Sequence, residues 1–191
     1  NFFFADPLEM LAGDVQTPGV FLQATAVLER QLLAYCLDRW AATGIDDSAI
    51  PGQMRHVLDA VENQQQAQFP YTLLAFIAEQ REVLLAGFFG LFERLDEDAR
   101  SYLSEALQHR DEGGLEMRLL LRLTQLVAER DSLARKVGQL RRERERLSGL
   151  PQDDATRQQV QEVEGERGGH AALLSSLNRQ LVLNFLTDEG L

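Results

Sequence analysis

The sequence predicts an all-α protein in which a compact helical head is followed by an antiparallel coiled-coil helical hairpin. Apolar residues recur at spacings of three and four along most of the chain, and no segment alternates with a period of two for long enough to form a strand. Five leucines repeat at intervals of seven residues, which places them along one edge of a single helix. These leucines are Leu119, Leu126, Leu133, Leu140 and Leu147.

The first 112 residues are expected to form a head domain of about five helices. Thr17 followed by Pro18 offers a hydroxyl cap and a proline at the first helical position, which is typical of a helix start. A long apolar segment after Pro70 is expected at the centre of the core, and Asp96 is expected to cap the helix that follows. The expected helices begin at about residues 6, 18, 48, 70 and 96, and the last ends before Gly113 and Gly114.

The charge of the chain is concentrated in this head. Residues 1–112 contain seven arginines and eighteen acidic residues, which accounts for the net charge of −11, whereas residues 113–191 contain twelve of each sign. An acidic head repels phosphate backbones, so we expect no nucleic-acid partner. The longest apolar run, residues 83–92, is about half of the ~20 residues that a membrane-spanning helix needs, so we expect no membrane span. A lone cysteine, Cys36, gives no sign of an oxidising compartment, and we expect a cytoplasmic protein.

Residues 115–191 are expected to form the hairpin domain, with helices at about 115–148 and 155–187. Pro151 interrupts the leucine repeat, and a second apolar stripe begins at Val160. If the chain turns back near residue 152, one register aligns the two stripes over their whole length. The residues expected in this seam, which is also the expected self-association region, are Leu119, Leu123, Leu126, Leu133, Val137, Leu140, Leu147, Val160, Val163, Leu174, Leu177, Leu181 and Phe185.

A parallel two-chain coiled coil, as in cytoskeletal or motor adaptors, is the competing arrangement. It would place Arg130 and Arg144 against their own copies, which is unfavourable, so the hairpin is preferred. The weak point of the hairpin is three glycines within residues 165–169, which cost about 1 kcal/mol each in a helix interior. We therefore expect a break or hinge at these glycines.

Apolar residues outside the seam predict a homodimer in which two hairpins form a four-helix bundle. The residues that such a dimer would cover are Leu115, Leu120, Leu121, Val127, Leu173 and Leu183.

No catalytic, cofactor-binding or metal-binding constellation is present in the sequence. The three histidines, His56, His109 and His170, fall on separate expected elements, and no two have the spacing of a helical metal site. The sequence therefore favours a non-enzymatic scaffold or adaptor whose partners are other proteins and a second copy of itself.

A small-ligand or lipid-binding helical bundle is the alternative from another functional class. It rests on the aromatic residues Phe88, Phe89 and Phe92, which, together with Leu84 and Leu85, would line a cavity in the head.

Overall fold

A computed structural model describes residues 25–92, 95–108, 113–151 and 153–188 of the chain. The described residues form helices and contain no strand, so the prediction of an all-α fold is confirmed. The expected helix near residue 6 and the expected helix start at Thr17 and Pro18 lie outside the described residues. The elements are α2 (Thr25–Ala41), the short 3-10 helix η2 (Asp47–Ala49), α3 (Met54–Glu62), α4 (Tyr71–Phe89), α5 (Glu97–Gln108), α6 (Leu115–Ser148), α7 (Asp154–Arg179) and α8 (Val182–Asp188). None of these helices is long and apolar enough to cross a membrane.

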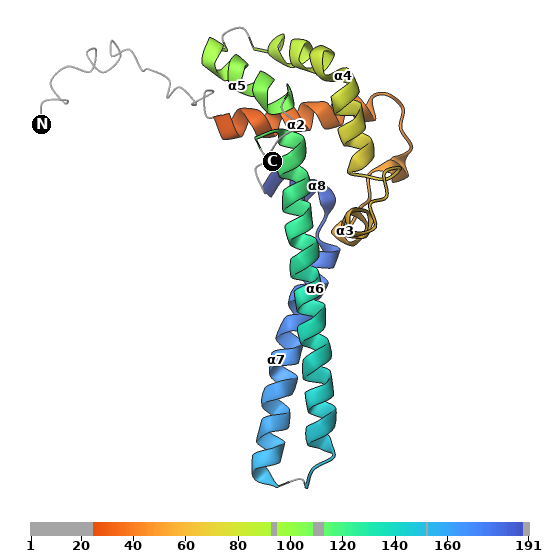
Figure 1. The fold of residues 1–191 in the computed structure, drawn as a ribbon, viewed down its shortest axis with the longest axis vertical. Helices are drawn as coiled ribbons and strands as arrows, with labels where there is room; N and C mark the ends of the chain where they lie inside the picture. Colours follow the sequence, from red (N-terminus) through yellow and green to blue (C-terminus); the bar gives the residue numbers. More distant parts are fainter. Residues whose placement is uncertain (1–24, 93–94, 109–112, 152, 189–191) are drawn as a thin grey trace, which may run out of the picture.

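The helices are arranged as a cluster and a long pair (Figure 1). Helices α2, α4 and α5 pack on one another at one end of the molecule. Helix α6 runs away from them, and α7 returns beside it in the opposite direction after a tight turn. Helix α3 contacts α6, α7 and α8, so it lies against the side of the long pair. The coiled-coil character of the pair and the division into domains at residues 112 and 115 remain predictions.

The hydrophobic core draws side chains from both ends of the chain. Leu32 of α2, Leu73 of α4, Leu119 of α6 and Phe185 of α8 are all at most 1% exposed and belong to one cluster. Leu115, which was expected on a dimer surface, is also inside this cluster at 3% exposure. That expectation is wrong for Leu115, because the first turn of α6 packs into the core instead of extending beyond it.

Helix α7 passes through Gly165, Gly168 and Gly169 without interruption, so the break expected there is not found. Glycine weakens a helix through backbone entropy but keeps its backbone hydrogen bonds, and packing against α6 holds the segment helical. The helix ends instead at Gln180, whose ψ of 136° is extended. The Met54 N–H donates to the Gln180 carbonyl at 2.9 Å, and the Val182 N–H donates to the Gly52 carbonyl at 3.4 Å. Gly52 and Met54 lie just before and at the start of α3. Backbone hydrogen bonds to a distant segment therefore set the helix end.

The aromatic side chains near the end of α4 pack against one another and against a tyrosine of α2. Phe88 is 1% exposed, and its ring centroid lies 5.0 Å from that of Phe92, 5.7 Å from that of Tyr35 and 6.3 Å from that of Phe89. Gly87 permits this packing, because a Cβ atom there would overlap the Tyr35 hydroxyl. The phenylalanines that were expected to line a cavity therefore pack against one another and against Tyr35.

Candidate interaction surface

The predicted seam residues fall into three groups by exposure. Six of them are buried, namely Leu119, Leu123, Leu126, Leu140, Leu147 and Phe185. Six more are half-buried, namely Leu133, Val137, Val160, Val163, Leu174 and Leu177. The remaining one, Leu181, is 53% exposed. The α6 half of the seam is thus covered more completely than the α7 half.

The inward position expected for Leu181 is occupied by its neighbour. Val182 is 1% exposed, whereas Leu181 points outward, so Leu181 does not lie in the seam between α6 and α7, and its part in self-association stays a prediction. The physical reason is the extended backbone at Gln180, which ends the helical phase of α7 before residue 181 is reached. Leu181 forms an isolated antiparallel bridge with Gln53, and this bridge fixes its outward direction.

Two ion pairs join α6 and α7 along their length. Arg144 lies 2.7 Å from Glu164, and Lys136 lies 3.1 Å from Glu166. The hydrogen bond from Lys136 lowers the pKa of the Glu166 carboxyl. Because all four side chains are exposed by more than a third, the pairs contribute little to stability and mainly favour this register.

A third charged contact, between α6 and α3, could not be foreseen from the sequence. Arg130 donates to Asp59 at 2.6 Å and to Glu62 at 2.5 Å, and its own side chain is only 12% exposed. Asp59 and Glu62 are three residues apart, so they share one face of α3. Arg130 therefore leaves the α6–α7 seam and links α6 to α3.

Replacing Arg130 with methionine is expected to lower the free energy of unfolding by about 1 kcal/mol, because both carboxylates are about half exposed and screened by solvent. Urea denaturation at low and high NaCl measures this loss, which should shrink as salt rises. The control is Arg135→Met, five residues further along α6 at an exposed position. Equal losses in the two variants would contradict a specific contact with α3.

The outer side of α7 is open. This 26-residue helix contains no fully buried residue, and Leu173 is 57% exposed. Beyond the end of α7, Leu183 is 54% exposed on α8. Exposed leucines therefore occur both on α7 and on α8.

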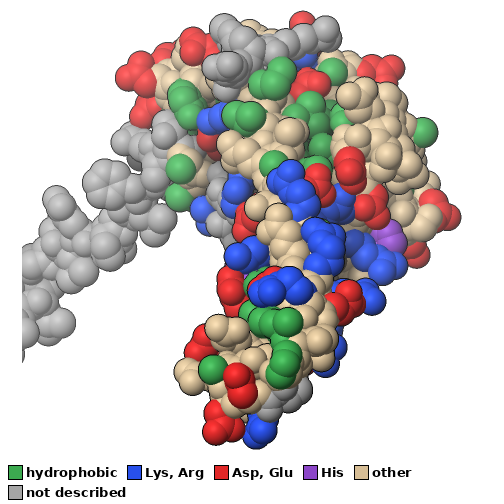
Figure 2. Space-filling view, turned by 60° about the horizontal axis from the view of Figure 1, so that its bottom comes forward, with side chains coloured by type: hydrophobic (Ala, Val, Ile, Leu, Met, Phe, Trp, Pro, Cys, Tyr) green, Lys and Arg blue, Asp and Glu red, His purple; other side chains and the backbone are tan. Residues whose placement is uncertain are grey.

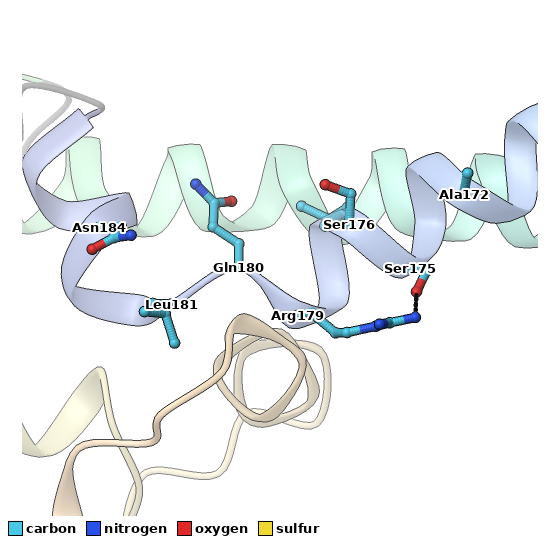
Figure 3. A pocket seen from close by; sticks show the side chains of 8 residues that line it. Ala172, Ser175, Ser176, Arg179, Gln180, Leu181 and Asn184 are labelled. Carbon is cyan, nitrogen blue, oxygen red and sulfur yellow. Dashed lines mark hydrogen bonds between the residues drawn. The ribbon is translucent and has the colours of Figure 1, made fainter.

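A groove lies at the junction of α7 and α8 (Figure 3). Its volume is about 860 Å³, and its lining is Ala172, Ser175, Ser176, Leu177, Arg179, Gln180, Leu181 and Asn184. The Arg179 guanidinium donates to the Ser175 hydroxyl within the groove. The groove thus combines hydroxyl, amide and guanidinium side chains with the two leucines Leu177 and Leu181.

No cluster of three or more histidine, cysteine or acidic side chains that could hold a metal ion occurs among the described residues. Burial raises the pKa of the Cys36 thiol to about 12, so this cysteine stays protonated at neutral pH.

Charged side chains of both signs cover the long helix pair (Figure 2). Lys and Arg side chains gather where the pair leaves the cluster, with Asp and Glu side chains among them. Helix α6 has nine cationic and five acidic side chains, whereas α7 has three cationic and four acidic ones. The two helices therefore carry surplus charge of opposite sign.

Comparison with protein-family models, with curated proteins and with solved structures finds no significant match for this chain.

Proposed function

We propose that this chain is a non-enzymatic protein–protein interaction scaffold that self-associates through the α6–α7 pair. The observation that carries the proposal is the open side of α7. The exposed leucines Leu173, Leu181 and Leu183 lie on α7, at its end and on α8, and Leu181 also lines the groove at that junction. Apolar side chains gathered on a surface in this way mark an interaction site.

A second copy of the chain suits this surface. Closed dimers are built from self-complementary patches, in which each copy offers what the other needs. The cationic surplus of α6 and the acidic surplus of α7 allow α6 of each copy to lie beside α7 of the other. The resulting four-helix arrangement covers the exposed leucines of both copies.

A parallel two-chain coiled coil is supported less well. The leucine stripe of α6 is already covered, since Leu126, Leu140 and Leu147 are all at most 7% exposed within one chain. A parallel dimer through this stripe would have to displace α7, which would lose the contacts of Val160 and Val163. Association through the open side of α7 requires no such exchange.

Sedimentation equilibrium of the whole chain at micromolar concentration tests the proposal. We expect a mass of about 43 kDa, twice the 21.5 kDa of one chain. A Leu173→Glu variant should weaken association by about tenfold or more, because a carboxylate would be desolvated in the contact. The matched control is Val83→Glu, at a 64% exposed position on α4, which should leave the dimer unchanged.

A wild-type mass of 21.5 kDa at these concentrations would refute self-association. Equal weakening by the two variants would show that the contact does not use α7.

A further inference from the structure

A second cavity lies in the helical cluster, away from the α6–α7 pair. It has a volume of about 510 Å³ and lies between the end of α2, the loop that contains η2 and the start of α4. Its apolar part is formed by Trp40 and Phe69, whose ring centroids are 6.3 Å apart. Cavities of this size with aromatic walls are typical of small-ligand sites.

The polar part of the cavity consists of one carboxylate, two hydroxyls and one amide. Asp46, Ser48, Gln68 and Thr72 line it, and Asp46 is the one charged residue among the lining side chains. The Oδ1 atom of Asp46 accepts hydrogen bonds from the Ser48 N–H at 2.8 Å and from its hydroxyl at 2.5 Å. Neither bond uses Oδ2, which leaves a carboxylate oxygen for a ligand.

One of these polar groups, the Thr72 hydroxyl, makes no hydrogen bond to the described residues. The Thr72 Oγ1 atom is buried and has no hydrogen-bond partner in the described part of the chain. A buried polar atom without a partner is costly, and a bound water or ligand is one way in which such an atom gains a hydrogen bond. This hydroxyl is independent of Asp46, because it comes from the first turn of α4.

We propose that this cavity binds a primary ammonium group carried on an apolar body, either a free aryl- or alkylamine or a lysine side chain. An ammonium is a cation with three hydrogen-bond donors, which matches the Asp46 carboxylate, the one charged group of the lining, and the side-chain oxygen atoms beside it. The apolar body lies against Trp40 and Phe69, where the aromatic rings also attract the cation. A carboxylate of the same shape is repelled by Asp46.

Trp40 makes the test direct, because it is the only tryptophan in the chain. Titrating the whole protein with phenethylammonium should change the tryptophan fluorescence saturably, whereas phenylacetate, with the opposite charge, should not. Asp46→Asn should weaken the binding by about fivefold, the upper range for an exposed ion pair. Asparagine caps helices as well as aspartate does, so the loop should keep its structure. Asp47→Asn is the matched control, since Asp47 is the next residue but does not line the cavity.

A second variant separates the hydroxyl from the carboxylate. Thr72→Val keeps the shape of the side chain and should lower the amine affinity while the melting temperature does not fall. A capped tripeptide with a central lysine identifies the source: binding of the peptide alone indicates a partner protein, and binding of phenethylammonium alone indicates a small molecule. The proposal is overturned if neither ligand gives a saturable change, if phenylacetate binds equally well, or if Asp46→Asn and Asp47→Asn bind alike.

Discussion

Replacing Leu123 with alanine is expected to lower the free energy of unfolding by about 2–5 kcal/mol. Leu123 is 1% exposed and belongs to the core cluster that joins α6 to α2, α3 and α8. Removing its side chain loses the burial of several methyl groups and leaves a cavity that the surrounding helices fill only in part. Urea denaturation followed by far-UV circular dichroism measures the change.

Leu121 provides the control for this prediction. It is two residues away on the same helix but 51% exposed, so its replacement by alanine should change the free energy of unfolding by about 0.5 kcal/mol or less. The two substitutions have the same effect on helix propensity, so their difference reports burial alone. Losses of similar size at both positions would contradict the orientation of α6 described above.

Replacing Gly165, Gly168 and Gly169 together with alanine is expected to raise the free energy of unfolding by about 3 kcal/mol. All three lie inside α7, and a Cβ atom at any of them meets nothing within 4 Å. Each alanine should therefore contribute about 1 kcal/mol through reduced entropy of the unfolded chain, without any steric penalty. The shift of the guanidinium midpoint at constant m-value measures the gain.

Gly87→Ala is the contrasting variant, because its added methyl group would overlap the Tyr35 hydroxyl within the helical cluster. This variant should gain nothing and should lose stability. If the triple alanine variant were no more stable than the wild type, α7 would not be a continuous helix through these glycines.

Local signals in the sequence were sufficient for the helices and several of their ends. The Asp96 carboxylate accepts a hydrogen bond from the Ala99 N–H at 2.7 Å, so the cap predicted there is confirmed. Asp153 caps α7 in the same way, because its carboxylate accepts a hydrogen bond from the Thr156 N–H at 2.7 Å. Such caps act within four residues, so they can be identified without knowledge of the fold.

Contacts between distant segments could not be predicted in the same way. Arg130 occupies a seam position by its spacing, yet it binds two carboxylates about 70 residues earlier in the chain. The helix end at Gln180 depends on hydrogen bonds to the segment before α3, more than 120 residues away. No spacing rule joins such segments, because their proximity follows from the packing of the whole core.

The cavity beside Trp40 also lacks a sequence signature. Its lining comes from the end of α2, the η2 loop and the residues at and just before the first turn of α4. None of these three segments has a sequence pattern that would mark a ligand site. Aromatic residues of this head were expected to line a cavity, but the cavity found here is formed by different ones. Loops that meet only after folding determined which residues line it.

The attachment of the long helix pair to α3 has a mechanical consequence. Helix α6 has 34 residues, which at 1.5 Å per residue makes it about 51 Å long. Arg130, near the middle of α6, and the bridge between Gln53 and Leu181 join the pair to α3 and to the segment before it, which should restrict the motion of the pair relative to α3. The paired helices α6 and α7 thus extend away from the cluster of α2, α4 and α5, with α3 packed against their side (Figure 1).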